Sequence, residues 1–127
     1  MGKRQNHHAR RGFTLVELLV VVIILGVLTA IALPSYLTSV NGSKATTANS
    51  NARALASAVQ SKAVSTNTYD TTLADYSTDL GGAIPINPCT GTATGYTISA
   101  TAGTATVTAQ SGTNCGIWTP ATFSMNL

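Results

Sequence analysis

The chain has 127 residues, of which 44% are hydrophobic and only 9% are charged. A chain of this size with a long apolar segment has room for one small domain, which excludes a multidomain enzyme. The low charge indicates a surface solvated by Ser, Thr, Asn and Gly, as suits an exported protein.

The formal net charge of +3 belongs to the N-terminus. Without its first eleven residues, the chain has three basic and four acidic residues, and 3 minus 4 gives −1. A basic run beside an apolar segment more often holds the end of a membrane helix in the cytoplasm than it binds nucleic acid. We therefore predict a basic leader and no direct nucleic-acid site. The leader's basic residues are Lys3, Arg4, Arg10 and Arg11.

Residues 13–33 read FTLVELLVVVIILGVLTAIAL, about the length that a helix needs to cross a bilayer. They contain one charge, Glu17. A secretory signal has its cleavage site after the apolar region, whereas here the sharp boundary Arg11-Gly12-Phe13 comes before it. Cleavage there would leave the apolar helix in the mature protein.

The segment Gly12-Phe13-Thr14-Leu15-Val16-Glu17-Leu18 resembles the processing motif of type IV pilins and pseudopilins. A glycine ends a basic leader, a phenylalanine opens the mature chain, a glutamate stands fifth in it, and an apolar helix follows. The resemblance continues through the Pro-containing stretch 30–36 and beyond it covers only the general layout. It implies that a prepilin peptidase cuts after Gly12 and methylates the amino group of Phe13.

A plain single-pass anchor would explain the leader and the helix without any filament. Glu17 argues against that alternative, because a carboxylate within an apolar membrane helix costs roughly 2.5 to 3.5 kcal/mol and usually has a functional partner. The partner that the resemblance implies is the amino group of Phe13, on the same chain or on a neighbour that joins the filament.

Beyond Pro34, small or apolar residues recur with helical spacing and predict that the helix continues. We expect a transmembrane and filament-core helix over residues 13–36 and an amphipathic continuation over 37–64. Pro34 and Gly42 are expected to kink or loosen it, which could help subunits repack on leaving the membrane. The predicted apolar stripe comprises Ala45, Ala48, Ala52, Leu55, Ala56, Val59 and Ala63.

Residues 65–127 are rich in Gly and Pro turn signals and predict a small antiparallel β region. Alternating patterns predict a hairpin from strands 96–101 and 104–109, with small apolar residues facing the helix and threonines facing outward. A third strand is expected at 116–119. The fold class is therefore α+β, with a long N-terminal helix packed on a small antiparallel sheet, as in pilins.

Polar and aromatic residues in the link between the helix and the sheet have simple interpretations. Tyr69 and Tyr76 are expected to pack, and Asp70, Asp75 and Asp79 to be solvated. A calcium loop would need more oxygen ligands in closer order.

Cys89 and Cys115 are the only cysteines, and one pair in an exported domain most simply forms a disulfide. The chain-entropy model gives such a bridge roughly 3 to 4 kcal/mol of stabilisation. The bridge also resembles the disulfide that bounds the C-terminal loop of many pilins. Two cysteines without nearby histidines supply too few ligands for a metal site.

No catalytic grouping is evident, so we predict neither an enzyme nor a cofactor. The only histidines, His7 and His8, lie in the leader, which leaves no partner for a Ser or Cys nucleophile. No glycine-rich phosphate cradle is present.

Three classes of function remain open. The first is a structural subunit of a type IV pilus, anchored in the cytoplasmic (inner) membrane before assembly and extracellular afterwards, acting in adhesion, twitching motility or DNA uptake. Its implied partners are further copies of itself, minor pilins, the prepilin peptidase and an inner-membrane assembly platform. The second is a pseudopilin of a type II secretion or competence system, and the third a membrane-anchored binding domain. The expected disulfide and the Ser/Thr-rich surface favour the first.

Overall fold

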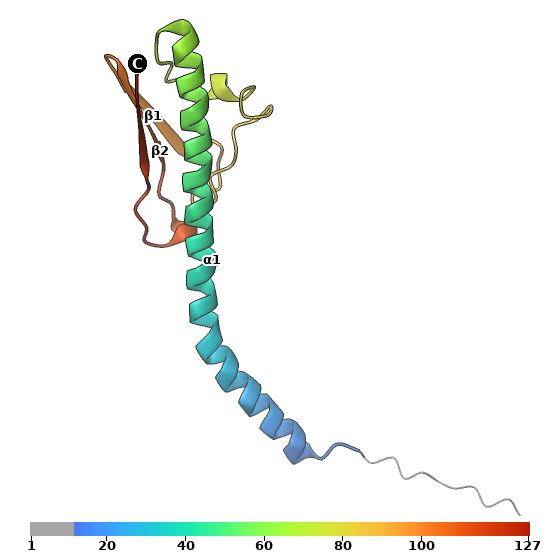
Figure 1. Cartoon of the computed structure of the whole chain (residues 1–127). Coiled ribbons are helices and arrows are strands. Elements are labelled where there is room, and N and C mark those ends of the chain that lie inside the picture. Colours follow the sequence, from blue (N-terminus) through green and yellow to red (C-terminus); the bar gives the residue numbers. More distant parts are fainter. Residues whose placement is uncertain (1–11) are drawn as a thin grey trace, which may run out of the picture. The chain divides into compact units, whose positions relative to one another are not determined.

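The computed structural model describes residues 12–127. One long helix, α1 (Leu15–Thr66), precedes a sheet of three strands, β1 (Tyr96–Thr101), β2 (Thr104–Ala109) and β3 (Thr122–Asn126) (Figure 1). Two short 3₁₀ turns, η1 (Leu73–Tyr76) and η2 (Thr113–Cys115), lie in the connections. The predicted α+β class, a long N-terminal helix on a small antiparallel sheet, is confirmed.

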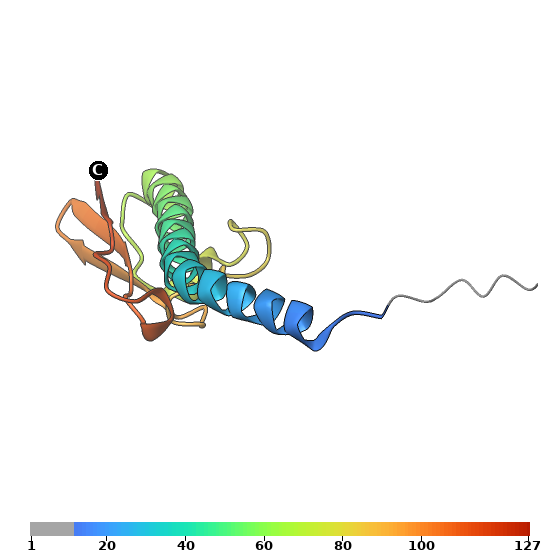
Figure 2. The same cartoon turned by 90° about the horizontal axis from the view of Figure 1, so that it is seen from below.

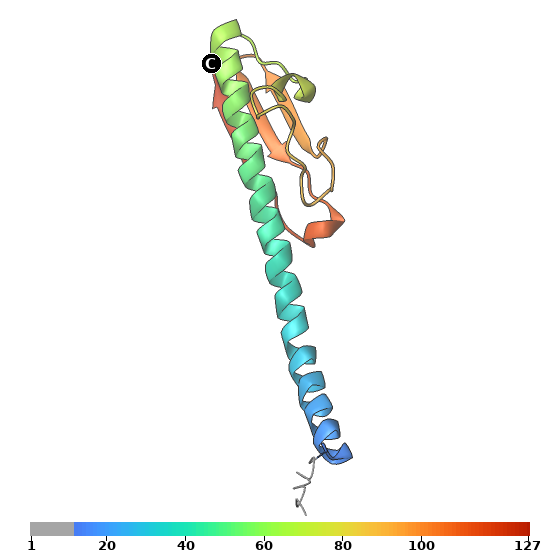
Figure 3. The same ribbon diagram turned by 90° about the vertical axis from the view of Figure 1, so that its right-hand side faces the viewer.

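The chain divides into two compact units, Met1–Tyr36 and Leu37–Leu127, and α1 contributes to both. In the first unit, the described residues form a helix whose side chains are all exposed. In the second unit, the rest of α1 lies along one face of the sheet (Figures 2 and 3).

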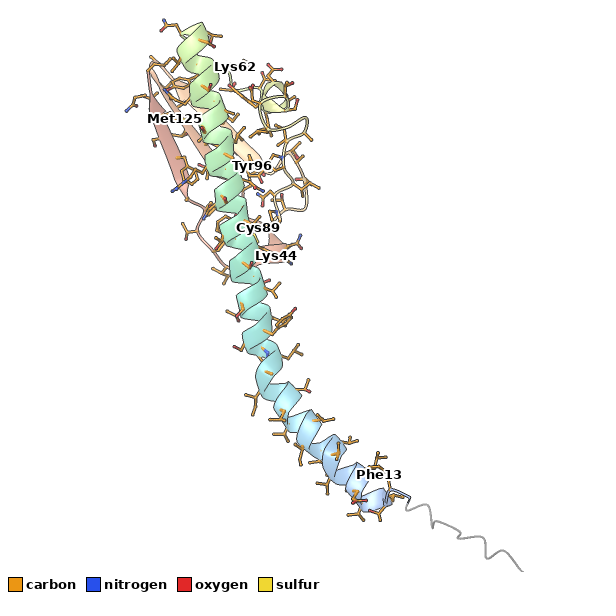
Figure 4. The ribbon with its side chains drawn as sticks, turned by 45° about the vertical axis from the view of Figure 1, so that its right-hand side comes forward. Phe13, Lys44, Lys62, Cys89, Tyr96 and Met125 are labelled. Atoms are coloured by element: carbon orange, nitrogen blue, oxygen red, sulfur yellow. A yellow bond between two sulfur atoms is a disulfide. The ribbon has the colours of Figure 1, made fainter. Side chains whose placement is uncertain are left out.

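The core of the second unit forms where the stripe of α1 meets the sheet. Ala48, Ala52, Leu55, Ala56, Val59 and Ala63 are buried and Ala45 is partly buried, as their helical spacing predicts. Opposite them lie the buried side chains of Tyr96, Ala105, Val107, Ala109 and Met125. The labelled Tyr96, Cys89 and Met125 lie beside α1 between Lys44 and Lys62 (Figure 4).

The predicted antiparallel hairpin is confirmed in the bounds of both strands. β1 pairs with β2 from Tyr96 opposite Ala109 to Thr101 opposite Thr104, and β2 pairs with β3 on its other side. β2 alternates between buried and outward residues along its whole length. In β1 only the first half is covered, since Tyr96 is buried, Ile98 is half-buried and Ala100 is exposed.

The prediction of a third strand at residues 116–119 is wrong, because β3 begins at Thr122, after Pro120. Gly116 has a φ of +67°, a conformation that ends extended structure, and Pro120 lacks the N–H that a strand interior needs. β3 then turns Phe123 and Met125 toward the core.

Tyr76 is fully buried and Tyr69 is half-buried, so the prediction that both tyrosines pack is confirmed. The prediction of solvated acids is wrong for Asp70. Its Oδ2 lies 2.9 Å from Lys62 Nζ, and its Oδ1 accepts a hydrogen bond from the Thr72 N–H. Lys62 Nζ also lies 3.9 Å from Asp75 Oδ2 and 4.9 Å from the ring centre of Tyr76. The cluster fixes the start of the link against the helix.

A second polar centre is Asn87, the buried polar residue next to the disulfide. Its Nδ2 donates to the carbonyls of Gly95 at 2.6 Å and Gln110 at 3.0 Å, and its Oδ1 accepts from the Cys89 N–H at 2.9 Å. One side chain thus joins the turn at residues 87–89 to the paired ends of β1 and β2, where the Gln110 N–H donates to the Gly95 carbonyl at 2.8 Å.

Asn87→Ala is expected to destabilise the second unit by about 3 kcal/mol, because it leaves buried backbone groups without partners. Urea unfolding of the detergent-solubilised chain measures this. Asn114→Ala, at an exposed position of the same region, is the control and should change stability by less than about 0.5 kcal/mol. Equal effects of the two substitutions would contradict the role given to Asn87.

The Lys62–Asp70 pair predicts a defined pH dependence. The Thr72 N–H and the Lys62 ammonium lower the pKa of Asp70 well below its ordinary value of 3.8. A carboxylate with a lowered pKa in the folded state stabilises the fold above its unfolded-state pKa, and this contribution is lost as pH falls through the folded-state pKa. Asp70→Asn should therefore lower the Tm at pH 7, and the difference from wild type should shrink below about pH 4.

The control is Asp79→Asn, since Asp79 forms no ion pair with any described residue. Its Tm should follow the wild-type Tm across this range. A constant Tm difference between Asp70→Asn and wild type from pH 7 to pH 2 would contradict the ionic account.

Candidate assembly site at the start of the helix

Thr14 and Glu17 close the first turn of α1 with reciprocal hydrogen bonds. The Glu17 N–H donates to Thr14 Oγ1 at 3.2 Å, while the Thr14 N–H and hydroxyl each donate to Glu17 Oε2 at 3.1 Å. This is a capping box, in which a Thr before the helix and a Glu three residues later satisfy each other's backbone donors. The sequence carries this signal as Thr-x-x-Glu, although the family resemblance implied only a pair with an amine for Glu17.

The cap leaves part of the carboxylate available. Within residues 12–127, its hydrogen bonds go to Oε2, and an ionised carboxylate can accept about four. Glu17 also lies in the first turn, where the helix dipole favours a negative charge. A further donor, and above all a cation, can therefore bind Oε1 without breaking the cap.

Phe13 lies directly before the capping residue and is 89% exposed (Figure 4). Cleavage after Gly12 would create an amino group at Phe13, one turn from Glu17. The cleavage and methylation at these residues stay predictions. Of the predicted leader, residues 1–12, all but Gly12 lies outside the described residues.

The helix that follows presents an apolar surface. α1 has a mean hydropathy of 2.9 in its most apolar window, and it is the one described helix whose length and composition would allow it to cross a membrane. Its polar Thr29 hydroxyl donates to the Leu25 carbonyl at 2.7 Å, which satisfies this donor within the helix.

Pro34 and Gly42 both lie inside α1, which continues through them. Proline removes one N–H donor from the hydrogen bonds of the helix. At Gly42, an added Cβ would have no other atom within 4 Å. The flexible points expected at these two residues therefore stay a prediction.

Cys89 and Cys115 form the predicted disulfide, with their Cα atoms 4.9 Å apart and both side chains buried. The loop that it closes contains β1 and β2. Gly112 lies against this bridge, since an added Cβ there would collide with the Cys89 carbonyl. In residues 12–127, no group of three or more His, Cys, Asp or Glu side chains could hold a metal ion.

Comparisons with known proteins agree with the chemistry of this N-terminus. Residues 7–33 match the family described as the prokaryotic N-terminal methylation motif. The chain is also 39% identical over 93 residues to the type IV major pilin protein PilA of Myxococcus xanthus (strain DK1622). The match covers 73% of this chain and 39% of that relative. No solved structure matches the chain significantly.

The N-terminus therefore carries the prokaryotic N-terminal methylation motif. Together the motif and the relative support the type IV pilin family, so the family predicted from residues 12–18 is confirmed.

Proposed function

We propose that this chain is a structural subunit of a type IV pilus that polymerises through its N-terminal helix. The observation that carries the proposal is that the described side chains of α1 in the first unit are all exposed and almost all apolar, with one carboxylate in the first turn, one turn from Phe13. Such a helix needs lipid before assembly and neighbouring helices afterwards, because none of residues 12–127 covers it.

In this proposal the prepilin peptidase removes the leader after Gly12 and methylates Phe13. The new amino group then pairs with a Glu17 carboxylate, on its own chain or on a neighbour. The capping bonds from Thr14 pre-orient that carboxylate, so the pair forms with little further ordering. Charge pairing is needed because a lone amine among packed apolar helices would be a buried charge without a partner.

The subunit would reside in the cytoplasmic (inner) membrane and then in an extracellular fibre, with an assembly platform and minor pilins as further partners. This role requires no catalytic group and no cofactor.

The second unit supports a surface fibre over the pseudopilin alternative. Its outward sheet face carries only uncharged polar side chains, and the disulfide fixes the loop that bears two of the strands. That face comprises Thr97, Ser99, Thr101, Thr104, Thr106, Thr108, Thr122, Ser124 and Asn126.

The test is to express the chain with Glu17→Ala or Glu17→Gln and to measure cleaved protein in membranes and protein in sheared fibres. Wild-type fibres should contain a chain that starts at methylated Phe13. Both variants should insert normally, because the substitutions remove the charge from an apolar helix. Both should also be cleaved normally, because Gly12 and Phe13 are unchanged. Fibre yield should fall about 100-fold or more, since breaking a buried charge pair costs about 3 to 5 kcal/mol.

Glu17→Gln separates the charge from the cap, because a glutamine at this position still completes a capping box. Thr14→Val does the reverse, keeping the charge and losing about 1 kcal/mol of capping. We expect Thr14→Val to assemble far better than Glu17→Gln. Wild-type yield from Glu17→Gln would remove the charge pair from the mechanism, and an intact leader in assembled protein would refute the processing step.

A further inference from the structure

Ile117 is a large apolar residue that does not pack into the core of the second unit. It is fully exposed, whereas the next residue, Trp118, packs against the core. Directly before this pair, Gly116 has a φ of +67°, a left-handed conformation that favours glycine.

The segment that displays Ile117 is held at both ends. Before it, Cys115 is bonded to Cys89, and the Lys44 ammonium donates to the Asn114 carbonyl at 3.4 Å. After it, the Ala121 N–H donates to Asn49 Oδ1 at 3.0 Å, which ties the orange-red segment back to α1 (Figure 1). A partner that binds Ile117 therefore meets a side chain whose loop is already ordered, which lowers the entropic cost of binding.

A groove of about 310 Å³ adjoins Ile117 in the second unit. It lies between the first turns of α1 in this unit and the segment after η2, and no ionisable side chain lines it. Its lining residues are Thr38, Asn41, Gly42, Ala45, Gly116 and Trp118, together with Cys115 and Ile117. A Cβ added at Gly42 would meet no atom within 4 Å, so this part of the groove has room for a side chain from outside.

We propose that Ile117 and the adjoining groove are a contact site for a second copy of this chain, and that the neighbour's apolar helix covers Ile117. This inference rests on the proposed function. The absence of charge in the groove selects an uncharged partner surface, because a charge buried there would lack a counter-ion. The chain offers such a surface in α1, which has no ionisable residue from Leu18 to Ser43 other than the Tyr36 phenol.

The contact is head-to-tail, since the groove and the apolar helix are different surfaces of the chain. A contact between unlike surfaces does not saturate in a dimer and can propagate into an open filament. The outward sheet face is also uncharged, but its hydroxyl groups would not cover an aliphatic side chain.

The test compares Ile117→Ser with Ile86→Ser in the full-length chain. Ile86 is the matched control, because it is also an exposed isoleucine of the second unit, at 62% exposure, and it does not line the groove. Both variants should keep wild-type membrane levels, disulfide and melting temperature. Fibre yield should fall at least tenfold for Ile117→Ser and stay within twofold of wild type for Ile86→Ser.

Equal fibre yields from Ile117→Ser and wild type would overturn the contact site, and so would an equal loss from both variants. Failure of the wild-type chain to form fibres would instead refute the proposed function, so the two failures are distinguishable.

A photo-crosslinking residue, benzoylphenylalanine, at position 117 or at position 86 identifies the partner directly. We expect fibres to yield crosslinks from position 117 to residues 13–37 of a second copy, and none to that helix from position 86. Crosslinks from position 117 only to lipid or to another protein, or no crosslinks, would overturn the inference.

Discussion

The surface of α1 from Leu18 to Ser43 carries no charge. Every described side chain of the chain's first unit, which ends at Tyr36, is exposed. Water is a poor solvent for such a surface, so the chain needs either lipid or other copies of the helix. The one acid at its start, Glu17, is tied into a capping box through one oxygen, and its second oxygen can accept a further donor. The apolar surface is stable only when a partner covers it, and the carboxylate favours a partner that brings a hydrogen-bond donor or a cation.

The second unit solves a different problem, because its core is built mainly from alanine and other small side chains. Little apolar area is available per residue, so covalent and polar links contribute a larger share of the stability. The disulfide, the hydrogen bonds of Asn87 and the Lys62–Asp70 pair each fix a segment without regular structure. Of these links, the disulfide also holds the segment directly before Ile117.

The features predictable from the sequence were periodic or local. The helical stripe and the β1–β2 hairpin follow from spacing alone, and residues 12–18 form a contiguous motif. The third strand was placed at residues 116–119 because Ile117 and Trp118 are large apolar residues. The actual strand follows Pro120, where Phe123 and Met125 alternate with polar residues. The role of Lys62 depends on where the link returns to the helix, and that of Asn87 on where the loop at residues 87–89 meets the ends of β1 and β2. No local pattern specifies either.

The most direct measurement is the structure of assembled fibres at a resolution that shows side chains. The account predicts that a Glu17 carboxylate lies within about 3 Å of a methylated Phe13 amino group, as expected for a charge-assisted hydrogen bond. Each apolar helix should also be enclosed by neighbouring copies. A fibre in which Glu17 faces water, or in which the apolar helix is not part of the subunit contacts, would contradict it.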